Sequence, residues 1–557
     1  MIKRWEVLNK SEVISQEETR SARLAANAAS IVETLLKNRN ITDRESFFNP
    51  PSASQLTNQS ANYFPDLDQE QLQKAVERIK TAIEKREKII VWGDYDVDGI
   101  CAAAVLWQTL HGLGANVLPH IPDRFEEGYG LGSERIKKLV EEGCQLIITV
   151  DSGITAVEEA DFIQELGADL IITDHHLKPD KLPEAYAIIH TTALCGTGIA
   201  WLLASKLSPK PHTLDPSLDL VAIATIADLQ PLLGANRALA RTGFEVLNKL
   251  ERPGLSALAD IAGLKPGTLG SYAAGWVFGP RINAVGRLKH GIEALRLLCT
   301  TDPTRARQLA QVLNRVNTER QELTVHTFDH AKGLVEEGDG LIVVYHDSWH
   351  EGIIGLVAGK IVEEYGRPAV VVSQGKEFSK GSARSVNGLN IVEVLRAGAD
   401  LLEDVGGHEA AAGFTIRTDK LDEFVKRIRK NTNPKLAKLD PRPVLKIDFP
   451  LPLEMVNTAL VKELQNFSPH GVANPEPVFL AKNAAVLQIK KVGRGRNHLK
   501  LGVAPESGSQ LFGVLWFNAS LPLVRGQRID FAYTPQIERW NGREGIVLKA
   551  RDVKLSP

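Results

Sequence analysis

The chain has 557 residues, of which 43% are hydrophobic and 24% are charged, so it is longer than one hydrophobic core usually serves and we expect about two to four domains. Its formal net charge of -2 excludes a globally basic protein, and any binding of nucleic acid must come from local basic surfaces. Four cysteines without a Cys-x-x-Cys pair, and the lack of any apolar run of about 18 residues, argue against a disulfide framework, a structural zinc site, a signal peptide and a membrane-spanning helix, and favour a cytoplasmic protein.

The first 75 residues carry no chemistry that the sequence identifies. They contain a helical pattern at about residues 21–37 and a run rich in Pro, Ser and Asn at residues 48–65. We expect this N-terminal extension to pack on the domain that follows. A second helical pattern, at residues 70–86, leads into the first predicted strand.

Three acidic residues follow a short apolar, β-branched strand at residues 89–92. Asp94, Asp96 and Asp98 occupy alternate positions, and carboxylates this close repel one another unless a cation offsets their charge. A metal site is therefore the first hypothesis, and a solvated acidic loop is the alternative. An EF-hand is excluded because Val105 stands where that loop needs a bidentate glutamate and because a strand precedes the acids.

Two further apolar strands end in the same way. Residues 145–150 lead into Asp151, and residues 168–173 lead into Asp174-His175-His176, with a helix predicted between them at residues 156–166. Strands of this kind alternating with helices indicate a parallel sheet covered on both faces, in which ligands bind beyond the carboxyl ends of the strands. Acids and imidazoles from three strands are thus expected to converge at one edge.

Two later segments carry candidate groups. Asp228 ends the apolar helix predicted at residues 219–227 and could be either a surface residue or a further ligand. Residues 278–287 predict a rigid loop that holds Arg281 and Arg287. Arginine pairs bidentately with phosphate, so this loop could clamp a phosphate; an interdomain salt bridge is the alternative.

A long helix and a second α/β unit follow. Asp302 can cap, and Pro303 can begin, a helix that continues to about residue 338, a strut of roughly 50 Å. The second unit comprises a strand at 340–345, a helix at 352–365 and a strand at 369–373. Beyond it, Ser382, Arg384 and His408, the last preceded by two glycines, could together hold an anion.

From about residue 437 the pattern changes to short alternating strands, which suggest a small β-barrel. This part contains 17 Lys and Arg residues against 10 Asp and Glu residues. Together with a basic loop and several aromatic residues, it fits a barrel that binds a single nucleic-acid strand and stacks its bases; aromatics that only fill the core are the alternative. The predicted strands are 486–492, 498–503, 510–516, 527–533 and 545–550, the hairpin signal is 540–543, the basic loop is 494–498, and the aromatics are Phe512, Trp516, Phe517, Phe531, Tyr533 and Trp540.

The order and identity of these motifs resemble the RecJ family of single-stranded-DNA exonucleases in the DHH phosphoesterase superfamily. The motifs that carry the resemblance are residues 93–99, Asp151-Ser152-Gly153, Asp174-His175-His176, Ala227-Asp228, residues 280–287, Gly407-His408 and residues 468–477. The resemblance implies an α/β protein with a parallel-sheet DHH catalytic domain, a long connecting helix, a second α/β (DHH-associated) domain and a C-terminal OB-type barrel. The expected boundaries are 1–75 for the extension, then 76–300, 301–338, 339–436 and 437–557 for these four parts.

The same resemblance assigns roles to the acids and imidazoles. It implies that two metal ions are held by Asp96, Asp98, Asp151, His175 and Asp228, with Asp94 as a further candidate and Asp151 as a bridge. It also implies that His176 faces the phosphate and that Asp174 orients a histidine, so that Asp151, His175, His176 and Asp174 form the catalytic set. Carboxylate and imidazole ligands without thiolate independently favour Mg²⁺ or Mn²⁺.

The resemblance further implies a pocket for the 5′ phosphate made by Arg281, Arg287, Ser382 and Arg384, with His408 nearby and Arg124 guiding the strand. One position departs from the family pattern. Trp92 stands where family members commonly have histidine, and indole cannot ligate a metal as imidazole does. One of the two metal positions is therefore expected to be weaker, to be completed by water, or to be supplied by Asp94 instead.

The expected function is that of a processive exonuclease that degrades single-stranded DNA from its 5′ end to 5′ mononucleotides in DNA repair and recombination. Expected partners are single-stranded DNA, a helicase of the RecQ type and a single-strand-binding protein; no membrane is involved, and a monomer is expected. Two alternatives stay open. One is a DHH phosphodiesterase for short oligoribonucleotides or cyclic dinucleotides, and the other is a non-catalytic strand-binding scaffold.

Overall fold

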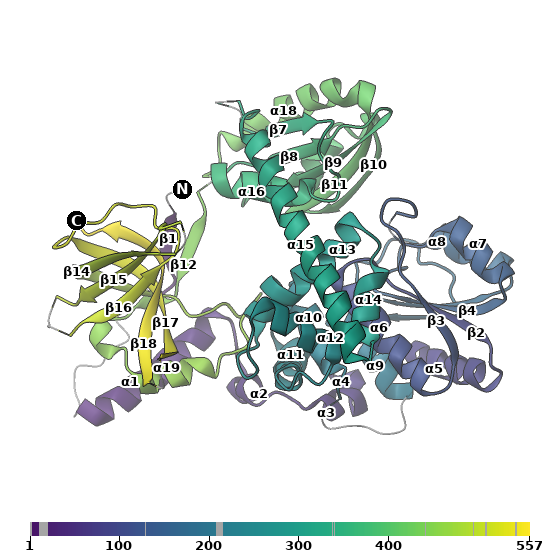
Figure 1. The fold of residues 1–557 in the computed structure, drawn as a ribbon, viewed down its shortest axis with the longest axis horizontal. Helices are drawn as coiled ribbons and strands as arrows, with labels where there is room; N and C mark the ends of the chain where they lie inside the picture. Colours follow the sequence, from purple (N-terminus) through teal and green to yellow (C-terminus); the bar gives the residue numbers. More distant parts are fainter. Residues whose placement is uncertain are drawn as a thin grey trace.

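Three folded bodies make up the protein (Figure 1). The computed structural model describes residues 3–9, 20–128, 130–207, 215–336, 338, 340–440, 442–493, 495–506, 510–540 and 543–557. Figure 1 shows a first α/β domain, a second α/β domain joined to it by the long helix α15, and a C-terminal barrel beside the first domain. The predicted fold class, two α/β domains followed by an OB-type barrel, is confirmed.

The first domain is built on a parallel sheet of five strands in the order β3-β2-β4-β5-β6. The inner strands β2, β4 and β5 are apolar runs that are largely buried, as the sequence predicted, whereas the edge strand β3 leaves Leu118 53% exposed. Because β2, β4 and β5 are neighbours, the residues that follow them meet at one edge. The strands are β2 (Lys88–Trp92), β3 (Asn116–His120), β4 (Cys144–Val150), β5 (Asp169–Asp174) and β6 (Ala187–His190).

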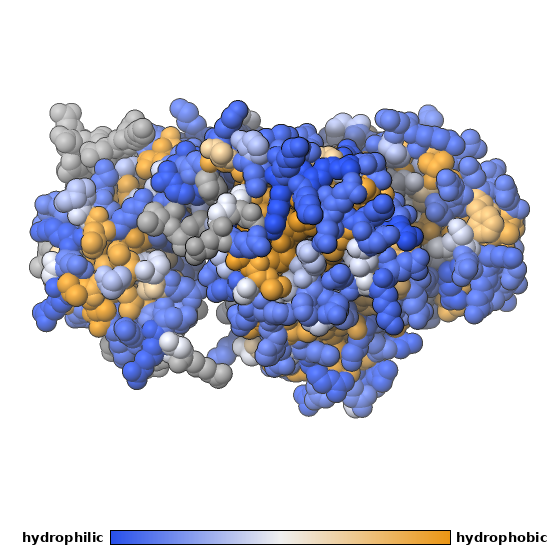
Figure 2. Space-filling model, turned by 90° about the horizontal axis from the view of Figure 1, so that it is seen from above, coloured by the Kyte–Doolittle hydropathy of each residue, from blue (hydrophilic) through white to orange (hydrophobic). Residues whose placement is uncertain are grey.

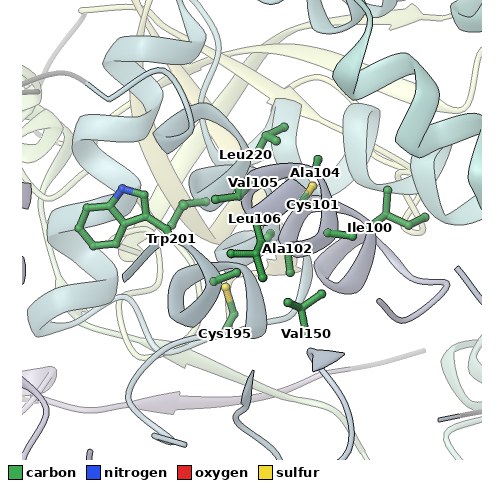
Figure 3. Packing of buried hydrophobic residues seen from close by; sticks show 14 of the residues in the cluster. Ile100, Cys101, Ala102, Ala104, Val105, Leu106, Val150, Cys195, Trp201 and Leu220 are labelled. Carbon is green, nitrogen blue, oxygen red and sulfur yellow. The ribbon is translucent and has the colours of Figure 1, made fainter. Parts of the chain in front are cut away.

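Helices cover both faces of this sheet and extend the domain toward the barrel. The central one is α6, which is apolar on all sides and is buried among its neighbours (Figure 3). Its burial fixes the position of its N-terminus at the edge of the sheet. The helices are α5 (Gln69–Glu84), α6 (Val97–Gly112), α7 (Ser133–Glu141), α8 (Val157–Glu165), α9 (Gly196–Leu207), α10 (Leu218–Ala227), α11 (Gly234–Leu247), α12 (Pro253–Ala262), α13 (Gly279–Leu288) and α14 (Ile292–Cys299).

The segment that the sequence predicted as a rigid loop, residues 278–287, is helical. A π-helix, η1 (Ala273–Phe278), runs directly into α13. The loop prediction was wrong because Pro280 lies in the first turn of α13, where a missing backbone N–H breaks no helical hydrogen bond. Arg281 and Arg287 therefore project from a helix.

The long helix α15 (Pro303–Lys332) connects the two α/β domains. The carboxylate of Asp302 accepts a hydrogen bond from the backbone N–H of Thr304 at 2.9 Å, which is the cap that the sequence predicted. The helix ends about six residues earlier than expected, at Gly333. Its 30 residues span about 45 Å.

The second domain contains a mixed five-stranded sheet in the order β10-β11-β9-β8-β7. The glycine-rich stretch before His408 is the end of a β-hairpin and not an open loop. Gly407 has a φ of 138°, and a Cβ there would lie 2.5 Å from the carbonyl oxygen of Ala411, so hairpin geometry requires this glycine. The elements are β7 (Ile342–His346), α16 (Ile354–Tyr365), β8 (Ala369–Ser373), β9 (Phe378–Arg384), α17 (Ile391–Arg396), η2 (Ala399–Leu401), β10 (Leu402–His408), β11 (Ala411–Arg417), η3 (Thr418–Lys420) and α18 (Leu421–Leu436).

The C-terminal domain is a closed barrel in the strand order β14-β15-β16-β18-β17, with β14 also paired to β17. Strand β14 is twice as long as predicted, and register shifts within it let one half pair with β17 and the other with β15. The elements are β12 (Val444–Ile447), β13 (Phe449–Pro450), η4 (Leu453–Met455), α19 (Thr458–Gln465), β14 (Phe479–Val492), β15 (His498–Ala504), β16 (Phe512–Trp516), β17 (Arg528–Trp540) and β18 (Arg543–Leu555).

Most of the barrel aromatics proposed for base stacking fill the core instead. Four of them are at most 6% exposed: Phe512, Trp516, Phe531 and Tyr533. For these four, the alternative prediction that the aromatics only fill the core is confirmed. Phe517 is 49% exposed. The side chain of Trp540, the hairpin residues 541–542 and Arg494 of the basic loop lie outside the described residues.

The N-terminal segment packs on two bodies rather than on the first domain alone. Strand β1 (Arg4–Val7) pairs with β12, and α1 (Arg20–Asn38) buries Leu35 and neighbouring side chains against the barrel. The later helices α2 (Arg44–Phe48), α3 (Ala53–Asn58) and α4 (Ser60–Tyr63) lead the chain to the first domain, and Leu56 and Phe64 are buried there. The extension therefore ties the barrel to the first domain.

A buried arginine strengthens the same junction. Arg237 on α11 is 1% exposed and donates hydrogen bonds to the carbonyl oxygens of Phe47 and of residues 466–469, at 2.8–3.4 Å. Burial lowers its pKa to about 10, but each donor is directed at a carbonyl dipole. The segment 468–477, which the sequence singled out, thus docks the barrel on the first domain.

The surface is polar over most of the face shown in Figure 2, where apolar side chains gather in a few separate patches. Among the described residues, no helix combines the length and the apolar character needed to cross a bilayer.

Candidate metal centre

The loop after β2 is compact because glycine lets two backbone segments touch. A Cβ on Gly99 would lie 2.4 Å from the backbone nitrogen of Asp94, a distance that no other residue tolerates. Asp96 caps α6, since its carboxylate accepts hydrogen bonds from the N–H groups of Asp98 and Gly99 at 2.9 and 3.1 Å. The helix N-terminus stabilises that negative charge.

Asp98 lies one residue into α6 and is held by the N-terminus of a second helix. Its two carboxylate oxygens accept hydrogen bonds from the backbone N–H groups of Gly196 and Thr197 on α9, at 2.7 and 2.8 Å. The residue is 1% exposed. Two helix N-termini thus orient the carboxylates of Asp96 and Asp98.

Asp151 follows β4 with a φ of 63°, a conformation uncommon for residues other than glycine and typical of strained functional positions. Its Oδ1 is buried, has no hydrogen-bond partner within the described part of the chain, and lies 3.1 Å from Nε2 of His175. Burial, and then the charges of Asp98 and Asp96, raise the pKa of Asp151 well above its usual range. Such a carboxylate is costly unless a cation neutralises it.

Asp174 at the end of β5 orders the two histidines that follow. It accepts hydrogen bonds from the backbone N–H groups of His175 and His176, at 2.7 and 3.1 Å, and from Nδ1 of His176 at 2.7 Å. Burial raises the pKa of Asp174, but the hydrogen bond from the His176 ring, the charge of that ring and the backbone hydrogen bonds from Ile154 and His176 together outweigh burial, and the net shift is downward. The same bond raises the pKa of His176 to about 9.

Asp228 closes the centre from the C-terminus of α10. Its Oδ2 lies 3.7 Å from Nε2 of His175 and accepts a hydrogen bond from Nε2 of Gln230 at 2.7 Å. Burial, followed by the charge of Asp98, raises the pKa of Asp228 to about 7. Gln230 is a site residue that sequence analysis missed.

The predicted residues form three overlapping groups. Within each group, the ligand atoms all lie within 4.8 Å of one another. All six predicted metal ligands are in these groups, and His176 joins one of them. Asp151 and His175 each belong to two groups, so they lie between the two ends of the cluster. The groups are Asp94, Asp96 and Asp151; Asp98, His175 and Asp228; and Asp151, His175 and His176.

The donor set fits divalent cations that prefer oxygen ligands. It offers carboxylates and imidazole without thiolate, and the buried Oδ1 of Asp151, which accepts no hydrogen bond from any described residue, is free to bind a cation. Ionised acids this close repel one another, and the raised pKa values of Asp94, Asp96 and Asp151 express that repulsion together with the cost of burial. Mg²⁺ or Mn²⁺ would remove both costs.

Trp92 is a core residue with a satisfied donor. It is 0% exposed, packs in an apolar cluster with Ile90 and Ile147, and donates its indole N–H to the carbonyl oxygen of Gly130 at 3.1 Å. The hypothesis that it weakens one metal position stays a prediction.

If an imidazole is needed at that position, Trp92→His should lower the Mn²⁺ concentration for half-maximal hydrolysis by roughly tenfold, a change typical for groups that support metal ligands. Metal titrations of the native and variant proteins, with melting curves to verify folding, provide the measurement. If the Mn²⁺ titration curves of the native protein and the variant coincide, Trp92 has no effect on metal binding and serves only in packing.

A cluster of arginines lies between the two α/β domains. Arg287 on α13 donates to the carbonyl oxygen of Gly352 at 3.3 Å, and burial, followed by the charges of Arg124 and Arg320, lowers its pKa to about 10. Arg384 contributes to the same shift. Arg320 on α15 is a member that the sequence did not reveal.

Ser382 and Arg384 project from β9 toward the start of α16. Nη1 of Arg384 donates to Oγ of Ser382 at 3.3 Å, and a Cβ on Gly355 would lie 3.0 Å from that Oγ and 3.1 Å from Nη2 of Arg384. Burial lowers the pKa of Arg384. Arg124, Arg287, Arg320 and Arg384 thus place four positive side chains that repel one another in a partly buried junction. Such a junction is suited to binding an anion.

The remaining substrate candidates lie at the margin of this cluster. Arg281 uses Nε and Nη1 to reach Asn314 and the carbonyl oxygen of Val277, at 3.1 and 2.9 Å, so it joins α13 to α15. Arg124 lies over the ring of Tyr95, 5.1 Å from its centroid. His408 is exposed on β10, separated from β9 by β11.

Comparisons with known proteins identify the family. Residues 88–225 match the DHH family N-terminal domain, residues 338–433 the DHHA1 domain and residues 447–552 the RecJ OB domain. The single-stranded-DNA-specific exonuclease RecJ of Bacillus subtilis (strain 168) is 35% identical over 99% of this chain and 71% of its own length.

Two crystal structures of RecJ from Thermus thermophilus have similar folds. The complex with Mn²⁺ has a TM-score of 0.83 at 30% identity and covers 100% of this chain and 80% of its own. The complex with Mg²⁺ has a TM-score of 0.76 at 28% identity, and the match covers 100% of this chain and 78% of the Thermus chain. With a curated relative matched over nearly the whole chain, this protein belongs to the RecJ family of single-stranded-DNA-specific exonucleases.

Proposed function

We propose that this protein hydrolyses single-stranded DNA from its 5′ end and releases 5′ mononucleotides with the help of two Mn²⁺ or Mg²⁺ ions. The observation that carries the proposal is the buried cluster of carboxylates and imidazoles at the edge of the parallel sheet, which contains an unpartnered Asp151 oxygen. Relatives named as single-stranded-DNA-specific exonucleases, and RecJ structures with Mn²⁺ and Mg²⁺, support it.

The residue groups divide between two ion positions. Asp94 and Asp96 would hold one ion, Asp98 and Asp228 the other, and Asp151 together with His175 would stand between them. When bound, two such ions would supply an activated water molecule, orient the phosphodiester and stabilise the leaving oxygen.

The two remaining catalytic candidates are His176, which belongs to one of the three ligand groups, and Asp174, which belongs to none of them. His176, whose pKa is about 9, stays protonated at neutral pH and would donate a hydrogen bond to an oxygen of the scissile phosphate. Asp174 fixes the orientation of that imidazole through Nδ1.

The arginine cluster would hold the 5′ phosphate. Arg287 and Arg384, with Ser382 between the domains, provide charged donors and a hydroxyl, and Arg320 adds positive charge. Arg281 and His408 would border this pocket, and Arg124 would guide the strand toward the metal centre. Anchoring the terminal phosphate here would set the first phosphodiester at the metals and produce one nucleotide per cut.

Replacing Arg384 with alanine should lower kcat/KM for 5′-phosphorylated strands by roughly 10- to 100-fold, because a charge-assisted hydrogen bond to phosphate contributes about 1.5–3 kcal/mol. Metal-dependent thermal stabilisation should be unchanged. The measurement compares 5′-phosphorylated with 5′-hydroxyl oligonucleotides, and Arg396→Ala, an exposed arginine of the same domain, is the matched control. Equal rates for the Arg384 variant and the native protein would remove this residue from the pocket.

A single assay separates the main function from its alternatives. End-labelled DNA of both polarities, single- and double-stranded, is incubated with Mn²⁺ beside short oligoribonucleotides and cyclic dinucleotides. Mononucleotides released only from the 5′ end of single-stranded DNA would support the proposal. Preference for the short ribonucleotides would indicate the phosphodiesterase, an activity that the name of the Bacillus subtilis relative does not support. Binding without hydrolysis would indicate the scaffold.

The wider setting is part of the same proposal. We infer a role in DNA repair and recombination, a cytoplasmic location, a monomeric state, and cooperation with a RecQ-type helicase and a single-strand-binding protein. For domain boundaries we propose 1–75, 76–300, 301–338, 339–436 and 437–557. The matched family regions 88–225 and 447–552 lie inside the second and the last of these parts, and the region 338–433 begins one residue before the fourth.

A further inference from the structure

The carboxylates of the metal centre are held in two different ways. Asp94, Asp96 and Asp98 accept hydrogen bonds from backbone N–H groups, at 2.6–3.1 Å. Every residue except proline supplies such a donor, so these contacts depend on the fold and not on the choice of a side chain. Asp228 differs, because its carboxylate accepts a hydrogen bond from the side chain of Gln230, at 2.7 Å. At Asp228, therefore, one side chain outside the ligand set determines how a carboxylate is held.

The turn after α10 directs the side chain of Gln230 back onto the end of the helix. Leu229 has a φ of 57°, a conformation that residues other than glycine adopt rarely and that is found most often at functional sites. The backbone N–H of Gln230 then donates to the carbonyl oxygen of Thr225, at 3.1 Å, and closes the helix end. Since the side chain of Leu229 is 70% exposed, its own packing does not account for this conformation. The turn instead places the Gln230 amide beside Asp228.

The same amide reaches a second ligand. Nε2 of Gln230 lies 3.4 Å from Nδ1 of His175. The other ring nitrogen of His175, Nε2, faces three carboxylates at 3.1, 3.7 and 3.8 Å, those of Asp151, Asp228 and Asp98. The ring thus presents Nε2 to the ligand cluster and Nδ1 to Gln230. In histidines that bind a metal ion, a hydrogen bond to the nitrogen that does not bind fixes the orientation of the ring.

A primary amide suits both of these neighbours. It carries two N–H donors and a carbonyl oxygen, so it can donate to a carboxylate and accept from an imidazole N–H. An imidazole that binds an ion through Nε2 carries its own proton on Nδ1, and the amide oxygen can accept a hydrogen bond from that N–H. Because the amide is neutral, Gln230 orients both groups without adding to the repulsion among the acids.

We propose that Gln230 is a positioning residue that holds Asp228 and His175 together as ligands of one ion, the ion assigned to Asp98 and Asp228. The inference rests on the proposed function. Without the amide, both side chains gain rotational freedom, and the ion must order them when it binds. The ion on the side of Asp94 is bound by carboxylates that backbone N–H groups orient, so loss of the amide should leave its binding unchanged.

Mn²⁺ binding in the absence of DNA tests this role directly. Free Mn²⁺ is measured by electron paramagnetic resonance while the full-length protein is titrated, which gives a dissociation constant for each ion without any catalytic step. Gln230→Met keeps the length of the side chain and removes its donors and its acceptor. It should weaken the binding of one ion roughly 10- to 100-fold, the usual effect of losing a group that supports a metal ligand. Since Gln230 is only half-buried, the variant should melt like the native protein.

The kinetics should change in a matching way. At a limiting Mn²⁺ concentration, Gln230→Met should lower kcat for single-stranded DNA and leave KM for DNA unchanged, because the side chain positions a metal ligand and does not hold the strand. Saturating Mn²⁺ should restore most of kcat, since the ligands themselves remain. A purely structural role would change the melting temperature and not this dependence on Mn²⁺.

Two further variants make the result specific. Gln230→Asn keeps the amide on a side chain that is one methylene group shorter, so it cannot contact both ligands and should weaken the same ion. Leu229→Ala removes the exposed neighbouring side chain from the same turn and should leave both ions bound as in the native protein. Native binding of both ions by Gln230→Met would overturn the inference. Equal weakening of both ions, or the same loss in Leu229→Ala, would also overturn it.

Failure of the inference and failure of the proposed function are distinguishable. If the native protein does not bind two Mn²⁺ ions, or does not hydrolyse single-stranded DNA with them, the proposed function is wrong. If it does both while Gln230→Met retains the native dissociation constants, the proposed function stands and Gln230 is not a positioning residue.

Discussion

Replacement of Asp151 by asparagine is expected to lower hydrolysis of single-stranded DNA by at least about 10³-fold, because bound metal ions contribute several kcal/mol of transition-state stabilisation. Asp151 belongs to two of the three ligand groups, and its Oδ1 lies 3.1 Å from Nε2 of His175. An amide has nearly the same shape and no charge, so the change removes the ligand and leaves the packing.

The same variant should keep its fold and its affinity for DNA. Its melting temperature should no longer rise on addition of Mn²⁺, whereas that of the native protein should, since an ion that binds only the folded state stabilises it. Asp260→Asn, on the exposed face of α12, is the control and should behave like the native protein. Turnover above a tenth of the native value would refute the central role of Asp151.

Replacement of Gly196 by alanine should lower kcat by roughly 100-fold. The added methyl group would lie 2.4 Å from Cβ and 2.5 Å from Oδ1 of Asp151, so one of the two segments must move. The backbone N–H of Gly196 also holds Asp98 at 2.7 Å. Displacement of catalytic groups by about 1 Å typically costs this much in rate.

The control for this change is Gly359→Ala. Gly359 lies within α16, and no atom of the described residues lies within 4 Å of the position of a Cβ there. Alanine at this position should be neutral or stabilise the helix by up to about 1 kcal/mol. Both variants are compared for kcat, for the Mn²⁺ concentration at half-maximal rate, and for melting temperature. Native kcat in Gly196→Ala would show that the contact with Asp151 relaxes without cost.

The sheet and the strand-end groups could be predicted because their signals are local. An apolar run that ends in Asp or His predicts both a buried strand and a polar group at the carboxyl end of that strand. Asp94, Asp151 and His175 each follow such a run, and the parallel order of β2, β4 and β5 brings them together. Asp302 and Pro303 likewise predicted the start of α15.

Other predictions failed where the surroundings decide the outcome. The segment around Pro280 reads as a loop by composition, yet packing against α10 and α15 makes it helical. The direction of Phe531 and Tyr533 depends on the closure of the barrel through β14 and β17. An alternating pattern shows that one face is apolar; barrel closure makes that face the interior.

Gly196, Gln230 and Arg320 carried no signal that the sequence could reveal. A glycine before a helix, an amide two residues after an acid and an arginine on a long helix are all common. Gly196 matters because Asp151 approaches it from another element, and Arg320 matters because α15 carries it to the junction with Arg287. Such roles arise from contacts between distant parts of the chain.

The sequence by itself determined which chemical groups this protein presents and on which kinds of element they lie, because strand pattern, capping and residue type are local properties. Only the tertiary structure decided which groups meet: Asp98 with the N-terminus of α9, Asp151 with Gly196, and His175 with Gln230. Packing between elements far apart in sequence sets these distances, and no local pattern encodes them.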